Sequence, residues 1–181
     1  MQIKNNRFRL MEIMFFNIIL SMFAFIIGYA AFDILFNNQI LDFDVDADAL
    51  SQISNTTSDM FFKNNFLFFL AISFLPIINT IFLFLQFFRL GNYAFSIKSM
   101  TINEQFVLLY RHTIFEVFAL ILSVYISYRI LFMVNAFTQN HTVDKKYYKK
   151  SFIKISTSIF LVFLSTLIGA ILEGNAYDYF Q

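Results

Sequence analysis

The apolar run at residues 11–36, MEIMFFNIILSMFAFIIGYAAFDILF, is the feature that most constrains the fold of this chain. A helix of roughly 20 mostly apolar residues spans the hydrocarbon core of a bilayer, and this run is longer. A cleaved signal peptide would have an apolar region of only about 7–15 residues and a small-residue cleavage site. The run instead ends in bulky residues, so we expect a retained membrane anchor. Lys4, Arg7 and Arg9 precede it and predict a cytoplasmic N-terminus.

The composition of the whole chain also indicates a lipid environment. Of the 181 residues, 59% are hydrophobic and 14% are charged, against about 45–50% and about 25% in ordinary globular chains. We therefore expect an all-α, polytopic transmembrane helical bundle that forms one integral membrane domain over residues 1–181. Its richness in Phe, Ile, Asn and Lys is typical of an AT-rich bacterial genome, so the expected location is a bacterial plasma membrane. The net charge of +1 argues against a nucleic-acid partner.

Two more runs, 66–88 and 153–172, are long enough to span. Pro76 lies near the middle of the first and predicts a helix kink, because it removes one backbone hydrogen bond. Asn79 and Thr80, one turn later, are expected to satisfy the freed carbonyl. Arg89 and Lys98 then indicate a cytoplasmic end. Residues 37–64 are expected to form an acidic external loop, and this loop lacks the glycine and glutamate of a calcium-binding EF-hand.

Residues 141–152 form a basic segment before the last run. The expected structure is an amphipathic cytoplasmic helix along the inner headgroups, with a docking site for a partner protein as the alternative. Its predicted membrane-surface anchor residues are Lys145, Lys146, Tyr147, Tyr148, Lys149, Lys150 and Lys154. The last span then runs outward.

Placing Lys98 and Lys145 both in the cytoplasm creates a conflict, since residues 104–135 must then cross twice or not at all. About 30 residues are too few for two crossings at roughly 1.5 Å per residue. A re-entrant dip that turns near Arg111–Thr113 satisfies the charges. The alternative is one plain crossing at 113–134, which would leave the lysine segment outside. The sequence thus predicts about four membrane segments, of which the third is possibly re-entrant.

Three ionisable residues, Arg111, His112 and Glu116, lie in this disputed stretch, where charged side chains are costly and mark candidate functional sites. His112 and Glu116 share a helix face, and we expect an intramembrane polar network that also includes Glu173. Its role is either a structural pair or a proton or ion relay. A catalytic zinc site needs three protein ligands, which these residues do not supply. We therefore predict no catalytic residue, metal or cofactor.

The segment RHTIFEVFALILSVYISYRI resembles a Pro-His-Gly-x-x-Glu segment of the stage II sporulation protein M family of bacterial membrane proteins. His112 and Glu116 match this pattern, whereas Arg111 and Thr113 replace its Pro and Gly. Arg129 falls near the arginine that ends the family's helix. Asn64–Asn65 resembles the start of its second span, and Glu173 in STLIGAILEGNAYDYF matches its closing glutamate. The resemblance covers roughly residues 60–176.

This resemblance implies a protein without catalytic activity. Sporulation members act as scaffolds that recruit peptidoglycan-remodelling enzymes, and small relatives support the maturation, export or producer immunity of circular bacteriocins. This short chain looks more like the second group. The implied partners are membrane lipid, other membrane proteins such as an ABC transporter or a second copy, and a bacteriocin peptide. A sporulation-type scaffold and a transporter subunit with a His112–Glu116 relay are the alternatives.

Overall fold

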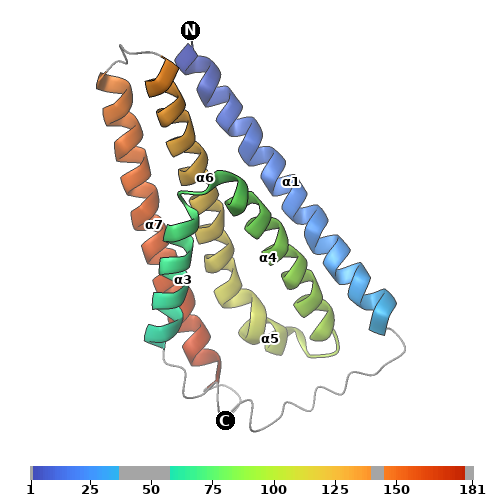
Figure 1. Ribbon diagram of the computed structural model, residues 1–181. Coiled ribbons are helices and arrows are strands. Elements are labelled where there is room, and N and C mark those ends of the chain that lie inside the picture. Colours follow the sequence, from blue (N-terminus) through green and yellow to red (C-terminus); the bar gives the residue numbers. More distant parts are fainter. Residues whose placement is uncertain (1, 37–57, 140–144, 178–181) are drawn as a thin grey trace.

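The computed structural model describes residues 2–36, 58–139 and 145–177, and every element in these ranges is a helix (Figure 1). The elements are α1 (Gln2–Phe36), α3 (Ser58–Ile72), α4 (Pro76–Ser96), α5 (Ile102–Gln105), the π-helical turn η1 (Phe106–Tyr110), α6 (Arg111–Gln139) and α7 (Lys145–Tyr177). The prediction of an all-α membrane protein is confirmed for this part of the chain. Most of the predicted acidic loop, and the start of the basic segment, lie outside the described residues.

Three helices are long and apolar enough to cross a membrane: Arg9–Leu35, Ile102–Thr138 and Lys145–Gly174. The first has 27 residues, or about 40 Å of helix against a hydrocarbon core of about 30 Å. Large apolar side chains cover the outside of the bundle, among them Phe15, Phe16 and Met22 of α1, each more than 60% exposed. Such a surface suits lipid rather than water.

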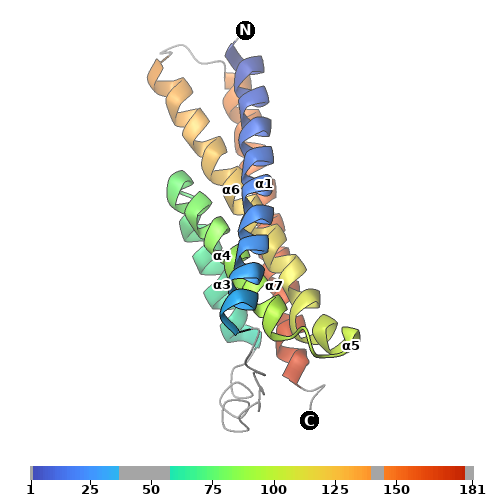
Figure 2. The same cartoon turned by 90° about the vertical axis from the view of Figure 1, so that its right-hand side faces the viewer.

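The spanning helices define two ends of the bundle. At one end α1 begins and α6 is followed by α7, and we call it the basic end because it carries the lysines of residues 145–154. α1 and α7 run away from the basic end, whereas α6 runs back toward it (Figures 1 and 2). The end of α4, the start of α3 and the end of α7 gather at the opposite end.

The predicted single span at 66–88 is wrong, because the chain turns back at its proline. α3 ends at Ile72, residues 73–75 turn, and α4 starts at Pro76 and returns to the opposite end (Figure 1). The 15 residues of α3 make about 22 Å of helix, which is too short to cross the bilayer core. The α3–α4 hairpin is therefore re-entrant in form. Instead of a kink within one helix, Pro76 occupies the first turn of a new one, where its missing N–H costs nothing.

Every backbone N–H at this turn has a partner, as a chain reversal away from water requires. Ser73 N donates to the carbonyls of Phe69 and Leu70, Phe74 N to Ala71, and Leu75 N to Ile72. The Ser73 hydroxyl also donates to the Phe69 carbonyl, at 2.7 Å. The next residue, Pro76, has no N–H to satisfy. The local sequence therefore allows the chain to reverse without leaving a backbone N–H of residues 73–75 unpaired.

The re-entrant dip predicted near Arg111–Thr113 is not found. These residues are helical, and α5, η1 and α6 form one continuous path from Ile102 to Gln139. The single-crossing alternative therefore describes this stretch. Lys98 lies at the opposite end, where its Nζ is 3.4 Å from Asp33 Oδ1 near the end of α1. The charge conflict disappears, because the hairpin does not carry the chain across.

The predicted surface helix at 141–152 is also corrected. Residues from Lys145 onward are the first turns of α7, which continues as a single helix to Tyr177. Lys145, Lys146, Lys149 and Lys150 are exposed there. The lysines thus surround the start of a spanning helix instead of lying along the membrane on a helix of their own.

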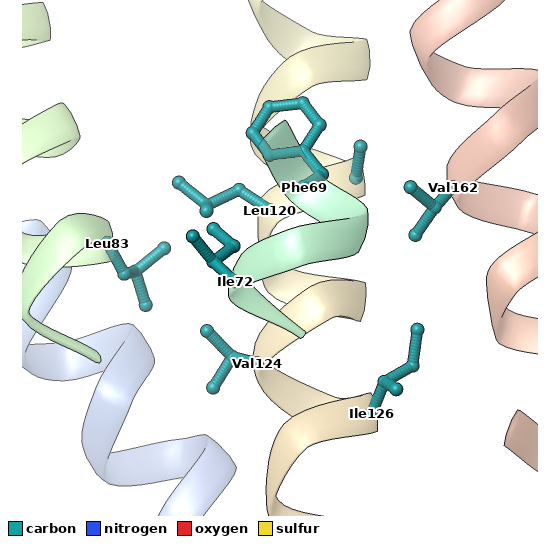
Figure 3. Close-up of a cluster of buried hydrophobic side chains, with 8 residues drawn as sticks. Phe69, Ile72, Leu83, Leu120, Val124, Ile126 and Val162 are labelled. Carbon is teal, nitrogen blue, oxygen red and sulfur yellow. The ribbon is translucent and has the colours of Figure 1, made fainter. Parts of the chain in front are cut away.

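The hairpin packs on the middle of α6 (Figure 3). Phe69 and Ile72 of α3 and Leu83 of α4 meet Leu120 and Val124 of α6, and all are at most 5% exposed. A polar layer accompanies this core: Asn79 Nδ2 donates to Ser123 Oγ at 3.2 Å, and the hydroxyls of Thr80 and Tyr128 lie 3.0 Å apart. Asn79 and Thr80 thus connect α4 to α6 by hydrogen bonds. The predicted role was to satisfy the backbone carbonyl freed by a kink at Pro76.

Small residues allow the closest helix contacts. Gly28 of α1 faces the backbone of Phe88, and Gly91 of α4 faces the backbone of Phe25, so closely that neither position has room for a Cβ. Membrane helices use such small-residue contacts because lipid supplies no hydrophobic drive for their association. The buried serines Ser151, Ser158 and Ser165 repeat every seven residues on α7, and Ser151 accepts a hydrogen bond from Arg129 of α6.

Candidate functional site

Five polar side chains from three helices meet near the opposite end of the bundle. The polar cluster, as we call it, comprises Asn65 of α3, Arg111, His112 and Glu116 of α6, and Glu173 of α7. Four of them were predicted as a network. Asn65 was noted only through the family resemblance, and its place in the cluster depends on the hairpin bringing α3 beside α6.

Two hydrogen bonds connect the polar cluster across helices. Asn65 Nδ2 donates to Glu116 Oε1 at 2.6 Å, between residues 51 positions apart in sequence. Arg111 Nη2 donates to the carbonyl of Leu172 at 2.9 Å. That carbonyl lies in the last turns of α7, where the negative end of the helix dipole favours a cation. Glu116 therefore fixes α3 to α6, and Arg111 fixes α6 to α7.

Within the described residues, no hydrogen bond joins His112 to Glu116, although their spacing predicts one. Glu116 takes its hydrogen bond from Asn65. His112 Nδ1, Arg111 Nε and Glu173 Oε2 are buried without a partner. Glu116 and Glu173 are close enough to repel each other electrostatically. The predicted grouping of Glu116 with Glu173 thus brings two like groups near each other.

Gly169 brings α7 close to this part of α6. A Cβ at Gly169 would lie 3.6 Å from Glu116 Cγ, from the His112 carbonyl and from Phe115 Cβ. The π-helical turn η1 ends directly before Arg111, and such turns shift the helix register locally. Arg111 and His112 follow that shift on the part of α6 that faces the end of α7.

The position of the polar cluster explains why the membrane tolerates it. Glu173 is one residue from the end of the spanning part of α7, and the next residue, Gly174, packs on Ser58 at the start of α3. Asp59 and Lys63 form an exposed ion pair on the first turns of α3. The cluster therefore lies toward one end of the spanning helices, and water and headgroups at a membrane surface lower the cost of ionisable groups there.

Comparison of the chain with models of protein families, with curated proteins and with solved structures finds no match. What can be said of function therefore depends on the residues and geometry of the chain itself.

The polar cluster offers proton-carrying groups and hydrogen-bond donors, but it has neither a serine nor a cysteine nucleophile beside its histidine. Among the described residues, no group of three or more histidine, cysteine or acidic side chains is placed to hold a metal ion. Neither Glu116 nor Glu173 forms an ion pair with a cation in the same ranges. The hydrogen bonds of the cluster join α3, α6 and α7 and so position these helices.

A second group of polar side chains lies near the basic end and was missed by sequence reasoning. It is centred on Arg129, which contacts Tyr125 and Ser151. The sequence does contain a signal for this group. Arg129 lies two-thirds of the way along an apolar helix, and no acidic residue that could pair with it occurs within ten positions on either side. Arg129 was noted only as a match to the family's helix-ending arginine.

Proposed function

We propose that the chain is a non-catalytic, multi-pass protein of the bacterial plasma membrane that acts with membrane partners in the maturation, export or producer immunity of a bacteriocin peptide. The observation that supports this most is the meeting of the resembling segments. Asn65, His112, Glu116 and Glu173 come from three separate stretches that resemble the stage II sporulation protein M family, and they lie in one polar cluster. Segments that matched the family only by chance would not be expected to come together in space.

The proposed orientation places the basic end in the cytoplasm. Lys4, Arg7 and Arg9 precede the span of α1, and five lysines lie at 145–154, out of 13 basic residues in the whole chain. Basic residues near the ends of spans are retained on the cytoplasmic side. The polar cluster and the α3–α4 hairpin then face the external side, where an exported peptide leaves the membrane.

The proposed partners are other membrane proteins, such as an ABC transporter subunit or a second copy. The turn of the hairpin supports this, since Phe74, Leu75 and Ile77 are 60%, 46% and 75% exposed around a break in the helix. A broken helix held inside a membrane is tolerated beside protein or a wet cavity more easily than beside lipid. The hairpin turn is therefore the surface we assign to a partner helix.

Deletion of the gene from a bacteriocin-producing strain tests this proposal. We expect the deletion strain either to lose bacteriocin activity from its supernatant or to become sensitive to the added peptide. Re-expression of the unaltered protein should restore the lost property. A producer that stays immune with a fully active supernatant would contradict the proposal, and a cell-wall defect in that strain would favour the sporulation-type scaffold.

A further inference from the structure

The second group of polar side chains, near the basic end, is centred on an arginine that donates to two hydroxyl groups. Arg129 Nη1 donates to Tyr125 Oη at 2.8 Å, and Nη2 donates to Ser151 Oγ at 3.3 Å. The guanidinium carbon also lies 5.6 Å from the centre of the Tyr125 ring. Ser151 is 1% exposed, and Arg129 is partly buried. The arginine head is thus held in one place between α6 and α7.

This arginine has unused hydrogen-bonding capacity and no counter-charge. A guanidinium has five N–H donors, and the two hydrogen bonds leave three of them, including the buried Nε. No ion pair in the described ranges involves Arg129. A partly buried charge without a partner is costly, so a suitable anion would bind here with a clear gain.

Tyr148 offers a further donor on the same face of α7 as Ser151. It precedes Ser151 by three residues on α7, so the two share a helix face. Its hydroxyl is buried without a hydrogen-bond partner. Together, Arg129, Tyr148 and Ser151 present N–H and O–H groups on facing parts of two helices, an arrangement that fits an oxyanion with several acceptor atoms.

The level of this group in the bundle identifies the class of anion. Ser151 follows Lys145 by six residues, or about 9 Å of helix, and the exposed Lys149 and Lys150 lie within one turn of it. Residues 145–154 hold five lysines and no acidic residue. This is the level of the lipid headgroups, and basic pockets between membrane helices on the cytoplasmic side bind anionic phospholipids.

We propose that Arg129, Tyr148 and Ser151 form a binding site between α6 and α7 for the phosphate of an anionic phospholipid headgroup. The phosphate diester accepts hydrogen bonds from the free guanidinium N–H groups and from the Tyr148 hydroxyl, while the neighbouring lysines add attraction from the surface. The bound lipid closes the basic end of the α6–α7 pair. This site is separate from the polar cluster and does not depend on the bacteriocin proposal.

Native mass spectrometry of the purified, full-length protein in detergent tests the site, with phosphatidylglycerol, phosphatidylcholine and inorganic phosphate as separate probes. We expect one phosphatidylglycerol to be retained in preference to phosphatidylcholine. Arg129→Gln should weaken this binding about tenfold or more, because a hydrogen bond to a charged group is worth that much. Arg129→Lys keeps the charge and should restore it only in part, since the ammonium lacks the planar fork.

Arg89→Gln is a matched control. Arg89 also donates to a tyrosine four residues away, Tyr93, at 3.2 Å, but this pair is exposed and lies on α4. Its loss should leave phosphatidylglycerol binding unchanged.

Tyr148→Phe keeps the test valid if the arginine variants fold poorly. It removes a hydroxyl that has no partner in the protein, so the melting temperature without lipid should not fall. Phosphatidylglycerol binding should still weaken a few-fold. Normal binding by both Tyr148→Phe and Arg129→Gln, or an equal loss in Arg89→Gln, would overturn the proposal. Binding of inorganic phosphate without any preference for phosphatidylglycerol would overturn the assignment to a lipid.

Discussion

At the scale of single residues, several ionisable side chains lie toward the ends of the bundle and form hydrogen bonds from one helix to another. Glu116 is bound to Asn65 and Arg111 to the end of α7, while Arg129 lies among the lysine turns at the basic end. The sequence predicted that Arg111, His112, Glu116 and Glu173 belong together. It did not predict Asn65 as the partner, because amide donors are common and a contact over 51 positions depends on the hairpin.

Asn65→Ala tests whether this contact stabilises the protein. It leaves Glu116 without its donor, so we expect a loss of stability, with a coupling to Glu116→Ala of about 0.6–1.7 kcal/mol in a double-mutant cycle. Unfolding by detergent denaturation measures the effect. Asn64→Ala is the control, because Asn64 is adjacent and exposed. Equal losses in both asparagine variants would contradict the assigned contact.

Glu116→Gln separates a structural role from a relay. The glutamine keeps an acceptor oxygen for Asn65 and removes the charge, so we expect normal abundance in the membrane. If the polar cluster only positions helices, bacteriocin production and immunity should persist as well. Normal abundance with lost activity would instead show that the carboxyl itself is used, and low abundance would contradict our account of the Asn65 contact.

At the scale of elements, the sequence predicted α1 and α7 well and the α3–α4 hairpin poorly. The runs 11–36 and 153–172 lie within Gln2–Phe36 and Lys145–Tyr177, because long apolar runs have few alternatives in a bilayer. The run 66–88 looked the same by hydropathy. Pro76 fits both a kink and a turn, and the choice here depends on distant contacts of α3 with α7 and of α4 with α1.

The glycine contact between α1 and α4 holds the returning arm of the hairpin. Gly28→Ala and Gly91→Ala each place a Cβ against backbone atoms, so we expect each to destabilise the protein by about 1–3 kcal/mol. Gly169→Ala is a matched control in the same bundle, because its Cβ would make only ordinary contacts at 3.6 Å. Thermal unfolding in detergent compares the three. A loss in Gly169→Ala as large as in the other two would contradict the close approach of α1 and α4.

At the scale of the whole molecule, three helices apolar enough to cross a membrane and a hairpin that returns to its own end of the bundle reconcile the charges with the chain. The sequence favoured a re-entrant dip at 104–135 over one plain crossing there, since hydropathy indicated a span at 66–88. In the structure the chain instead reverses within Ser58–Ser96, and Ile102–Gln139 is helical throughout. Because the chain reverses near Pro76 and crosses at 102–138, the lysines of α7 and the N-terminus share one end of the bundle. Lys98 lies near Asp33 at the other end.

Cysteine labelling tests this central claim most directly, because the chain has no cysteine of its own. Lys98→Cys and Lys146→Cys would be treated in intact cells with a maleimide that does not cross the membrane. The account predicts labelling of position 98 from outside, and labelling of position 146 only after the cells are opened. Labelling of position 98 only after the cells are opened would contradict the re-entrant hairpin and restore a full crossing at 66–88.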